Sequence, residues 1–373
     1  MDTAGPVDPV EARKGEHLRL AADGDVDART GAGWSDVRLV HEALPEVDPD
    51  EVDLRVSFLG RQLAAPLLIA GMTGGHAAAA AVNSRLARAA ARHGLAIGVG
   101  SQRAALRRPE LVATYTVMRE QAPQAFLLGN IGAAQLVPQD AGPPLSLAQV
   151  QNLVSALRAD ALAVHLNFLQ ETVQPEGDRR AAGVLDAIRK LVQELGVPVI
   201  AKETGAGLSR ESARRLVDAG VAALDVGGLG GTSFAAVEGL RAGRQGDQRN
   251  QRLGEVFREW GIPTAVSVVA AAGLGRPVIA TGGIRSGLDA ARALALGATL
   301  AGVARPLLQA ALQSDEAVDA WIEQFLAELR AAIFLSGART AAGLRSRPRV
   351  ILGETREWLA QLGYLGESQP AAT

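Results

Sequence analysis

The sequence predicts a single (β/α)8 TIM barrel, and three observations support that prediction. Eight short apolar runs rich in β-forming residues alternate with amphipathic helical patterns at intervals of tens of residues. The alternation continues without a break in composition. The chain has 373 residues and is 48% hydrophobic, which is enough for one large core. One barrel therefore explains the pattern better than two doubly wound domains.

The predicted strands are short, and all but the last are followed by a glycine or a polar residue. In chain order they span residues 67–70, 95–99, 125–128, 161–164, 198–201, 223–226, 278–280 and 300–303. Between them, residues 184–195 repeat apolar side chains at three and four positions, and Gly196 follows as a helix end. Residues 78–93 form a second predicted helix. A third begins at the capping residue Ser286 and stops at Gly297.

Two long segments and a C-terminal extension lie outside the repeat. Residues 1–60 form an N-terminal arm and extension, residues 61–353 the barrel, and residues 354–373 a C-terminal extension whose last residues, 366–373, we expect to be disordered. Residues 227–277 make a long insertion after strand six, because an ordinary connection is much shorter. Its polar part, 241–252, indicates a lid or an ordered insertion, and 264–272 a helix beginning at Thr264.

Composition excludes several classes of function. Lys and Arg total 38 and Asp and Glu 40, so a net charge of −2 leaves no basic excess for a nucleic-acid partner. No run is long enough to span a membrane and no export signal is visible, which favours a cytoplasmic protein. There is no cysteine, so disulfides, iron–sulfur clusters, thiolate zinc and a cysteine nucleophile are excluded.

The most polar cluster, residues 165–178, follows predicted strand four, where parallel α/β proteins place active sites. Glu171 suits Mg²⁺, which takes one or two protein carboxylates, although a lone loop acid is more often simply solvated. Gln170 is a neutral amide that orients groups and is a poor proton acceptor. His165 is either a titrating group or a buried, hydrogen-bonded histidine.

Small residues follow the first three strands, at 71–75, 100–103 and 129–132. They let a flat ligand lie against the backbone, or they are only tight turns. Lys202 ends strand five, where it meets electron-rich ligand atoms or pairs with Glu203. We favour the ligand, because a strand-end lysine in a barrel points to the mouth.

The best physical case is for a phosphate site. Residues 281–285 follow strand seven and lead into the helix at Ser286, so free amides and the helix dipole converge there. Residues 304–306 follow strand eight and complete the site, where barrels commonly bind phosphate. The glycines of 227–233 supply further amides or form a hinge. Arg13 and Lys14 are either a solvated basic pair or close over an anionic substrate.

These motifs, in this order and spacing, resemble the type 2 isopentenyl-diphosphate delta-isomerases. The resemblance rests on Arg13-Lys14 with His17, and on the strings at 72–75, 100–103, 129–132, 165–178, 225–233 and 282–285. It runs from about residue 11 to about residue 353. It implies an FMN-dependent barrel that interconverts isopentenyl and dimethylallyl diphosphate, with NADPH as reductant, Mg²⁺ on the diphosphate, and a homo-oligomer, a tetramer or octamer.

The resemblance also implies a set of site residues. Flavin contacts would be Met72, Thr73, Ser101, Asn130, Lys202 and Thr232, and flavin phosphate contacts Gly282, Gly283, Arg285, Ala304 and Arg305. The substrate would meet Arg13, Lys14, Ser101, Gln102, Arg103, His165, Asn167 and Gln170, with Glu171 as the Mg²⁺ ligand. Gln170 would be the catalytic residue, because the reaction is a proton shift without net redox change and the amide would position or relay one proton.

Two other functions compete with the isomerase. A 2-hydroxy-acid oxidase uses a similar barrel but requires a histidine base late in it, and the five histidines, at 17, 41, 76, 93 and 165, include none after strand four. A catalytically silent FMN-binding scaffold would keep the phosphate loop without needing Gln170 and Glu171 together. A yellow protein unable to convert isopentenyl diphosphate under reducing conditions would favour the scaffold.

Overall fold

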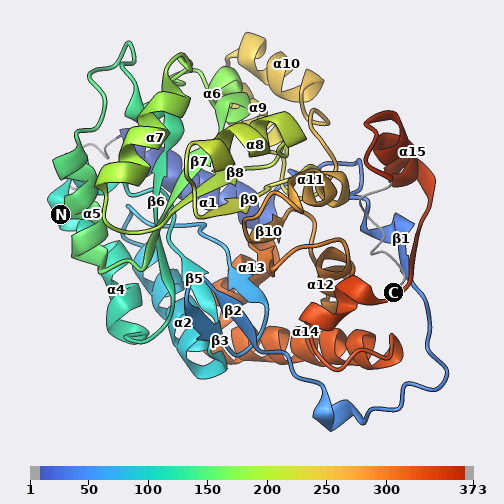
Figure 1. Ribbon diagram of the computed structural model, residues 1–373. Coiled ribbons are helices and arrows are strands. Elements are labelled where there is room, and N and C mark those ends of the chain that lie inside the picture. The colour runs from blue at the N-terminus through green and yellow to red at the C-terminus, as the bar shows by residue number, and fades with distance from the viewer. Residues whose placement is uncertain (1–8, 366–373) are drawn as a thin grey trace.

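The computed structural model describes residues 9–365, and the predicted (β/α)8 barrel is confirmed. Eight parallel strands close in the order β10-β11-β4-β5-β6-β7-β8-β9 (Figure 1). They are β4 (Leu67–Ile69), β5 (Ala96–Gly98), β6 (Leu127–Gly132), β7 (Ala161–Leu166), β8 (Val199–Glu203), β9 (Ala223–Asp225), β10 (Val278–Thr281) and β11 (Leu300–Val303). Each of the eight predicted runs overlaps one of these strands.

Three strands extend two or more residues further toward their carboxyl ends than the sequence predicted. β6 continues to Gly132 and β7 to Leu166, so the motif at 129–132 and His165 belong to strands and not to the loops after them. β8 likewise includes Lys202 and Glu203. The ladder β6–β7–β8 is regular through these residues, pairing Gly132 with His165 and His165 with Lys202. Polar residues that seemed to end a strand are therefore held at its end by backbone pairing.

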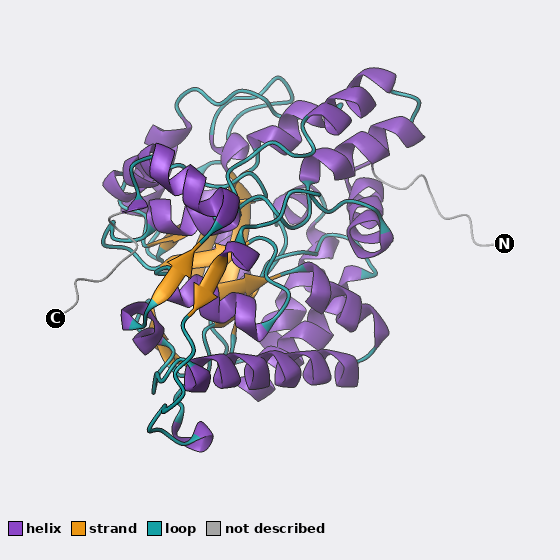
Figure 2. Ribbon diagram, turned by 90° about the vertical axis from the view of Figure 1, so that its right-hand side faces the viewer, coloured by secondary structure: helices purple, strands orange, loops and turns teal. Residues whose placement is uncertain are grey.

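Helices cover the outside of the barrel, as Figure 2 shows. The helices that follow the barrel strands are α2 (Ala79–His93), α3 (Arg103–Arg107), α4 (Ala113–Gln121), α5 (Leu147–Leu157), α6 (Phe168–Val173), α7 (Val184–Glu194), α8 (Arg210–Asp218), α12 (Gly287–Ala295), α13 (Arg305–Gln313) and α14 (Asp315–Leu335), of which α3 and α6 lie at the mouth. The predicted cap of α12 is present, since the Ser286 side chain accepts a hydrogen bond from the Asp289 amide at 3.1 Å. The short α6 was not predicted.

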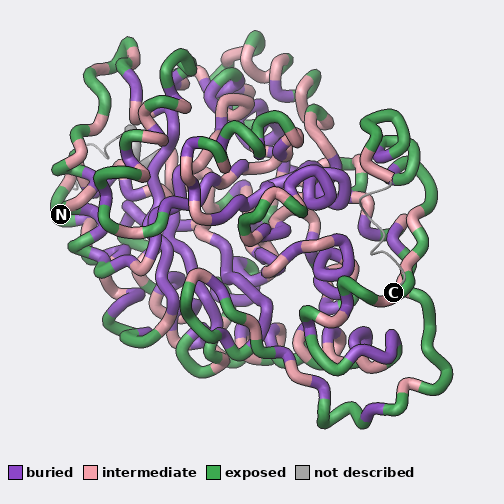
Figure 3. Tube along the Cα trace, viewed as in Figure 1, coloured by how far each residue is buried: buried purple, intermediate pink, exposed green. Residues whose placement is uncertain are grey.

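The amino-terminal end of the barrel is closed by a hairpin. Strands β2 (Val56–Phe58) and β3 (Arg61–Leu63) pair antiparallel, and Phe58 is fully buried against the edge of Phe126, with ring centroids 5.5 Å apart. Phe58 shares an apolar cluster with strand residues such as Leu68 and Ile200. Figure 3 shows the strands of the barrel as buried along most of their length.

The N-terminal arm and one insertion contribute to the carboxyl end of the barrel. The insertion after β9 folds into α9 (Phe234–Arg244), α10 (Gln248–Val256) and α11 (Thr264–Ala271), the last being the helix expected there. The arm forms α1 (Pro9–Asp23), which packs on α9 and α13. The arm therefore packs against the helices that follow β9 and β11.

Away from the barrel mouth, β1 (Val37–Leu39) pairs with β12 (Arg349–Ile351), and α15 (Gly353–Gln361) follows. This pairing of two distant short segments was not predicted. The expected disorder of residues 366–373 lies outside the described residues. Within residues 9–365, no helix is both long and apolar enough to cross a bilayer.

Candidate active site

A cavity of about 610 Å³ opens at the carboxyl ends of the strands, a size typical of small-molecule sites. It gathers side chains from α1, from the loops after several barrel strands and from α9. Of the predicted site residues, it is lined by Arg13, Lys14, Met72, Thr73, Ser101, Arg103, Asn130, His165, Asn167, Gln170, Glu171, Lys202, Thr232, Gly282, Gly283, Arg285, Ala304 and Arg305. The structure therefore brings together nearly all the residues that the sequence singled out.

Gln102 is the exception, and its contact with substrate stays a prediction. It is 2% exposed and does not line the cavity. Its Oε1 accepts from the Asn130 amide at 3.0 Å, and its Nε2 donates to the Leu153 carbonyl at 3.2 Å. Both polar atoms of the Gln102 side chain are therefore used in hydrogen bonds within the protein, which join the loop after β5 to β6 and α5.

At one side of the mouth lies a stretch of bare glycine backbone with two arginines, which we call the phosphate cradle because its chemistry fits a phosphate. Gly282 and Gly283 have φ values of +125° and +65°, and a Cβ on either would collide with the carbonyl oxygen of Gly228 or Gly230. Arg285 and Arg305 border this bare backbone, and the Nε of Arg305 is buried with no protein partner among the described residues. Exposed backbone, a helix start and two guanidinium groups fit a phosphate.

The opposite side of the mouth carries a carboxylate and amides. Glu171 is 7% exposed; its Oε1 accepts from Asn167 Nδ2 at 3.0 Å and its Oε2 from the Asp178 amide at 2.8 Å. Burial is the main cause that raises the pKa of Glu171. Arg103 donates to Asp178 at 2.5 Å. In the closed order of strands, β7 stands four places from β11, directly across the barrel from the phosphate cradle.

The Glu171 region fits a hard cation with few protein ligands. The Oδ1 of Asn167 is buried without a hydrogen-bond partner, so one amide oxygen and one carboxylate are at hand. Among residues 9–365, no group of three or more acidic or histidine side chains is arranged to hold a metal. A cation here would take most of its ligands from water and substrate, as Mg²⁺ commonly does.

Between the phosphate cradle and the Glu171 region, Asn130 and His165 form a hydrogen-bonded pair. Asn130 Nδ2 donates to the Val99 carbonyl at 3.0 Å, so its Oδ1 accepts from His165 Nδ1 at 2.8 Å. Burial, and then the charges of Lys202, Lys14 and Arg103, lower the pKa of His165 to about 3. The ring is therefore neutral, and its Nε2 presents a lone pair and not a proton.

The Lys202 ammonium forms an ion pair with the Asp225 carboxylate and not with the Glu203 carboxylate. Its Nζ lies 2.9 Å from Asp225 Oδ2, and the Asp225 side chain is 2% exposed. The Glu203 carboxylate instead accepts from the amides of Gly205, Ala206 and Gly207. Lys202 also lines the cavity, so the pair and the expected ligand contact are compatible.

Lys14 fastens the arm to the mouth. Its Nζ donates to the carbonyls of Gly74 and Ser101, at 2.9 and 2.6 Å, and to the Tyr115 hydroxyl at 2.7 Å. Burial, with a contribution from Arg13, lowers the pKa of Lys14 to about 7. These three acceptors use the three N–H bonds of the ammonium, so Lys14 holds the arm in place as well as lining the cavity.

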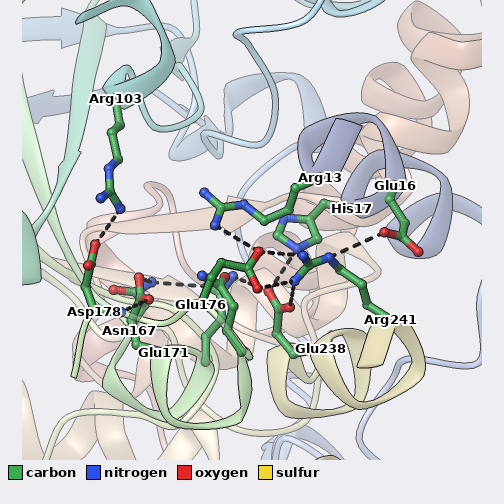
Figure 4. Close-up of polar contacts among 12 residues, drawn as sticks. Arg13, Glu16, His17, Arg103, Asn167, Glu171, Glu176, Asp178, Glu238 and Arg241 are labelled. Atoms are coloured by element: carbon green, nitrogen blue, oxygen red, sulfur yellow. Dashed lines mark hydrogen bonds and ion pairs between the residues drawn. The ribbon is translucent and has the colours of Figure 1, made fainter. Parts of the chain in front are cut away.

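A buried acid that sequence reasoning missed lies next to Gln170. Glu238, on α9, is fully buried, and its Oε1 accepts from Gln170 Nε2 at 2.9 Å. The same oxygen lies 2.8 Å from His17 Nε2 (Figure 4). Its Oε2 accepts from Arg241 at 2.9 Å. Burial opposes ionisation, but the charge and hydrogen bonds of His17, Gln170 and Arg241 lower the pKa of Glu238 to about 2.

The same network reaches the arm through Arg241. Arg241 contacts Glu176 at 2.5 Å and Glu16 at 3.4 Å, and Glu176 lies 3.4 Å from Arg13. Figure 4 shows these side chains of α1, α9 and the segment after α6 converging on one spot. A signal existed in the sequence, because Glu238 and Arg241 stand three residues apart within an otherwise mostly apolar helix.

Comparison with known proteins identifies two levels of similarity. The model of the FMN-dependent dehydrogenases matches residues 19–129 and 147–350. The chain is 51% identical over 350 residues to an isopentenyl-diphosphate delta-isomerase of Methanoregula boonei, covering 93% of this chain and 96% of the relative. It is 48% identical over 353 residues to the protein of that name from Methanosarcina barkeri, covering 94% and 95%.

Solved structures agree with the fold. A mandelate oxidase determined with (S)-2-phenylpropionate superposes with a TM-score of 0.59 at 20% identity, covering 92% of this chain and 97% of the other. A second mandelate oxidase structure, with 2-hydroxy-phenylacetamide, gives a TM-score of 0.58 at 21% identity, covering 90% and 94%. At such identities the likeness concerns the barrel and its layout alone.

Proposed function

The chain belongs to the isopentenyl-diphosphate delta-isomerases, within the FMN-dependent dehydrogenase family, and on that premise we propose that it interconverts isopentenyl and dimethylallyl diphosphate with reduced FMN and Mg²⁺. One observation supports this most strongly: a single cavity joins a phosphate cradle after β10 and β11 to a carboxylate and arginine cluster after β5 and β7. Two phosphate-bearing ligands would thus enter from opposite sides and meet over the barrel axis.

The flavin is assigned to the side of the cradle. Gly282, Gly283, Arg285, Ala304 and Arg305 would hold its phosphate, and the ring would extend over the small residues after β4 and β5. The ring contacts we propose are Met72, Thr73, Ser101, Asn130, Lys202 and Thr232, which line the same cavity. When reduced by NADPH, the flavin would supply an electron-rich surface that stabilises positive charge on the substrate and exchanges a proton.

The substrate is assigned to the opposite side. Arg13 and Arg103 are cations at the cavity wall that would meet the diphosphate, and Glu171 with Asn167 would bind Mg²⁺ on it. His165, being neutral, would accept a hydrogen bond through Nε2 and would not contribute charge. Lys14 would hold the arm over the substrate, so that the reacting carbons are shielded from water.

Gln170 is the residue to which we assign the chemical step on the substrate side. The isomerisation adds a proton to one terminal carbon and removes one from the allylic carbon, with no net change in oxidation state. A neutral amide is a weak base, so Gln170 would orient or relay a proton, with Glu238 fixing its direction. The oligomeric state, a tetramer or octamer by resemblance, stays a prediction.

An anaerobic assay tests this proposal. Formation of dimethylallyl diphosphate is followed with FMN, NADPH and Mg²⁺ present, and each is then omitted in turn. We expect activity to disappear without FMN and to depend on reduction. Full turnover in protein freed of flavin would refute the flavin role. Oxidation of a 2-hydroxy acid instead would favour the oxidase, although in the described chain only His17 and His165 are histidines that line the cavity, and neither follows a late strand.

A further inference from the structure

Asp27 occupies an unexpected place for an acid, at the phosphate cradle. It lines the same cavity as Arg285 and Arg305, and its side chain is 30% exposed. Its Oδ2 lies 2.7 Å from Arg285 Nη2 and its Oδ1 2.8 Å from Arg305 Nη1. One carboxylate therefore bridges the two guanidinium groups that border the bare glycine backbone.

The backbone around Asp27 is fixed against the barrel. The Ala28 amide donates to the Gly231 carbonyl at 2.8 Å, and the Ser233 amide donates to the Val26 carbonyl at 2.7 Å. Asp27 itself forms an antiparallel bridge with Thr232. These bonds set the position of its Cα, so rotation of its side chain is the movement that remains available to it.

The charges at this place do not suit two anions at once. Two guanidinium groups carry two positive charges, and Asp27 neutralises one of them. A phosphate monoester brings a charge of about −1.5 to −2 and needs donors of the same kind. A carboxylate a few ångströms away would repel it in this partly buried site.

We propose that Asp27 is an internal competitor for the flavin phosphate: its carboxylate holds Arg285 and Arg305 when the phosphate is absent and is displaced when it binds. The inference rests on the proposed function, because it takes the cradle as the flavin phosphate site. Asp27 would thus weaken the binding of FMN and stabilise the cofactor-free protein.

The same exchange couples the cofactor to the arm. Arg305 Nη2 also donates to the Gly24 carbonyl at 2.8 Å, and Gln309 Nε2 donates to the Ala22 carbonyl at 2.8 Å. Both carbonyls lie at the carboxyl end of α1, which carries Arg13, Lys14 and His17. An Arg305 that turns from Asp27 toward a phosphate acts on the end of the helix that covers the substrate side.

Flavin titration of the cofactor-free protein tests the proposal. Binding of FMN and of riboflavin, which lacks the phosphate, is followed by flavin fluorescence in the wild type, Asp27→Asn and Asp25→Asn. We expect Asp27→Asn to bind FMN at least fivefold more tightly while riboflavin affinity changes less than twofold. Asp25 is a matched control two residues away, because its side chain is 83% exposed and pairs with Arg258 outside the cavity.

Unchanged or weaker FMN binding by Asp27→Asn would overturn the competition, and weaker binding would mean that Asp27 orients the arginines for the phosphate. Equal tightening of FMN and riboflavin would also overturn it, since the phosphate would then not be the competitor. A wild type that binds neither flavin would instead refute the proposed function, so the two failures are distinguishable.

Thermal unfolding supplies a second measurement that does not depend on flavin fluorescence. The cofactor-free Asp27→Asn protein should unfold at a lower temperature than wild type, and added orthophosphate should restore more stability to the variant than to the wild type. A variant as stable as wild type without ligand, or one that orthophosphate stabilises less, contradicts the proposal. A cooperative transition in the variant establishes that it is folded.

Discussion

Gln170 donates a hydrogen bond from Nε2 to Glu238 Oε1 at 2.9 Å, and its Oε1 accepts from Asn167 Nδ2 at 3.2 Å. Because Glu238 is ionised and accepts only, the NH2 group of Gln170 must face it. Asn167 in turn donates to Glu171, the proposed metal ligand. The amide of Gln170 is therefore held in one orientation between Glu238 on α9 and the Asn167–Glu171 pair.

Replacing Gln170 by Ala should lower kcat by about 100-fold or more, the usual contribution of a positioned proton-transfer group. The KM for isopentenyl diphosphate should change much less, because Arg13, Arg103 and Glu171 remain. Steady-state kinetics under reducing conditions with saturating FMN measures both values. The control is FMN affinity, which should equal that of wild type. Full turnover by the variant would remove Gln170 from the mechanism.

Replacing Glu238 by Ala should destabilise the protein by about 3 kcal/mol, because the buried Arg241 would lose its fully buried carboxylate partner and Gln170 its acceptor. Arg241 has a side chain only 6% exposed, so water cannot compensate for the loss. Urea unfolding measures the free energy. Glu16→Ala is the matched control: its carboxylate also faces Arg241 but is 19% exposed and 3.4 Å away, so we expect a loss below about 1 kcal/mol. Equal losses would contradict this difference.

Replacing Glu171 by Gln should raise the Mg²⁺ concentration needed for half-maximal activity by roughly tenfold, since a neutral amide is a weaker ligand for this cation. A magnesium titration at saturating substrate measures it. Glu176→Gln removes a carboxylate from the same segment, but one that pairs with Arg241 and Arg13. It should leave the metal requirement near that of wild type. An unchanged titration for Glu171→Gln would exclude Glu171 as the ligand.

The sequence was sufficient for the barrel because its strands are continuous apolar runs, which parallel sheets buried on both faces require. It also found the loops after β5, β7, β10 and β11, whose glycines and charges stand together in the chain. It missed Glu238, which contacts Gln170 from a helix of the insertion, and Asp27, which lines the cavity from the arm. Glu238 contacts Gln170, which is 68 positions away in the chain, and Asp27 contacts Arg285, which is more than 250 positions away. No local sequence pattern encodes contacts over such separations.

His165 should stay neutral from pH 9 down to at least pH 5, because its pKa is lowered to about 3. Its ring C2–H resonance should show no titration in that interval, with the remaining histidines as internal references. In the unfolded chain the pKa of His165 is about 6.5, so between pH 6.5 and 3 the unfolded state binds a proton that the folded state does not. The stability contributed by neutral His165 is therefore present above pH 6.5 and is lost as the pH falls from 6.5 toward 3. A midpoint near 6.5 for the folded resonance would contradict the buried, neutral ring.

Lys14 should make folding more favourable as the pH rises from 7 to about 10.5. Its folded pKa is about 7 while that of the unfolded chain is 10.5, so in this interval the unfolded state binds one more proton. The free energy of unfolding should then rise by at most about 1.4 kcal/mol per pH unit from this group. Urea unfolding at pH 7 and pH 9, in wild type and in Lys14→Met, measures the slope. Methionine keeps the length of the side chain and cannot titrate, so its slope should be smaller. Equal slopes in the two proteins would mean that Lys14 keeps its proton among the carbonyls of Gly74 and Ser101.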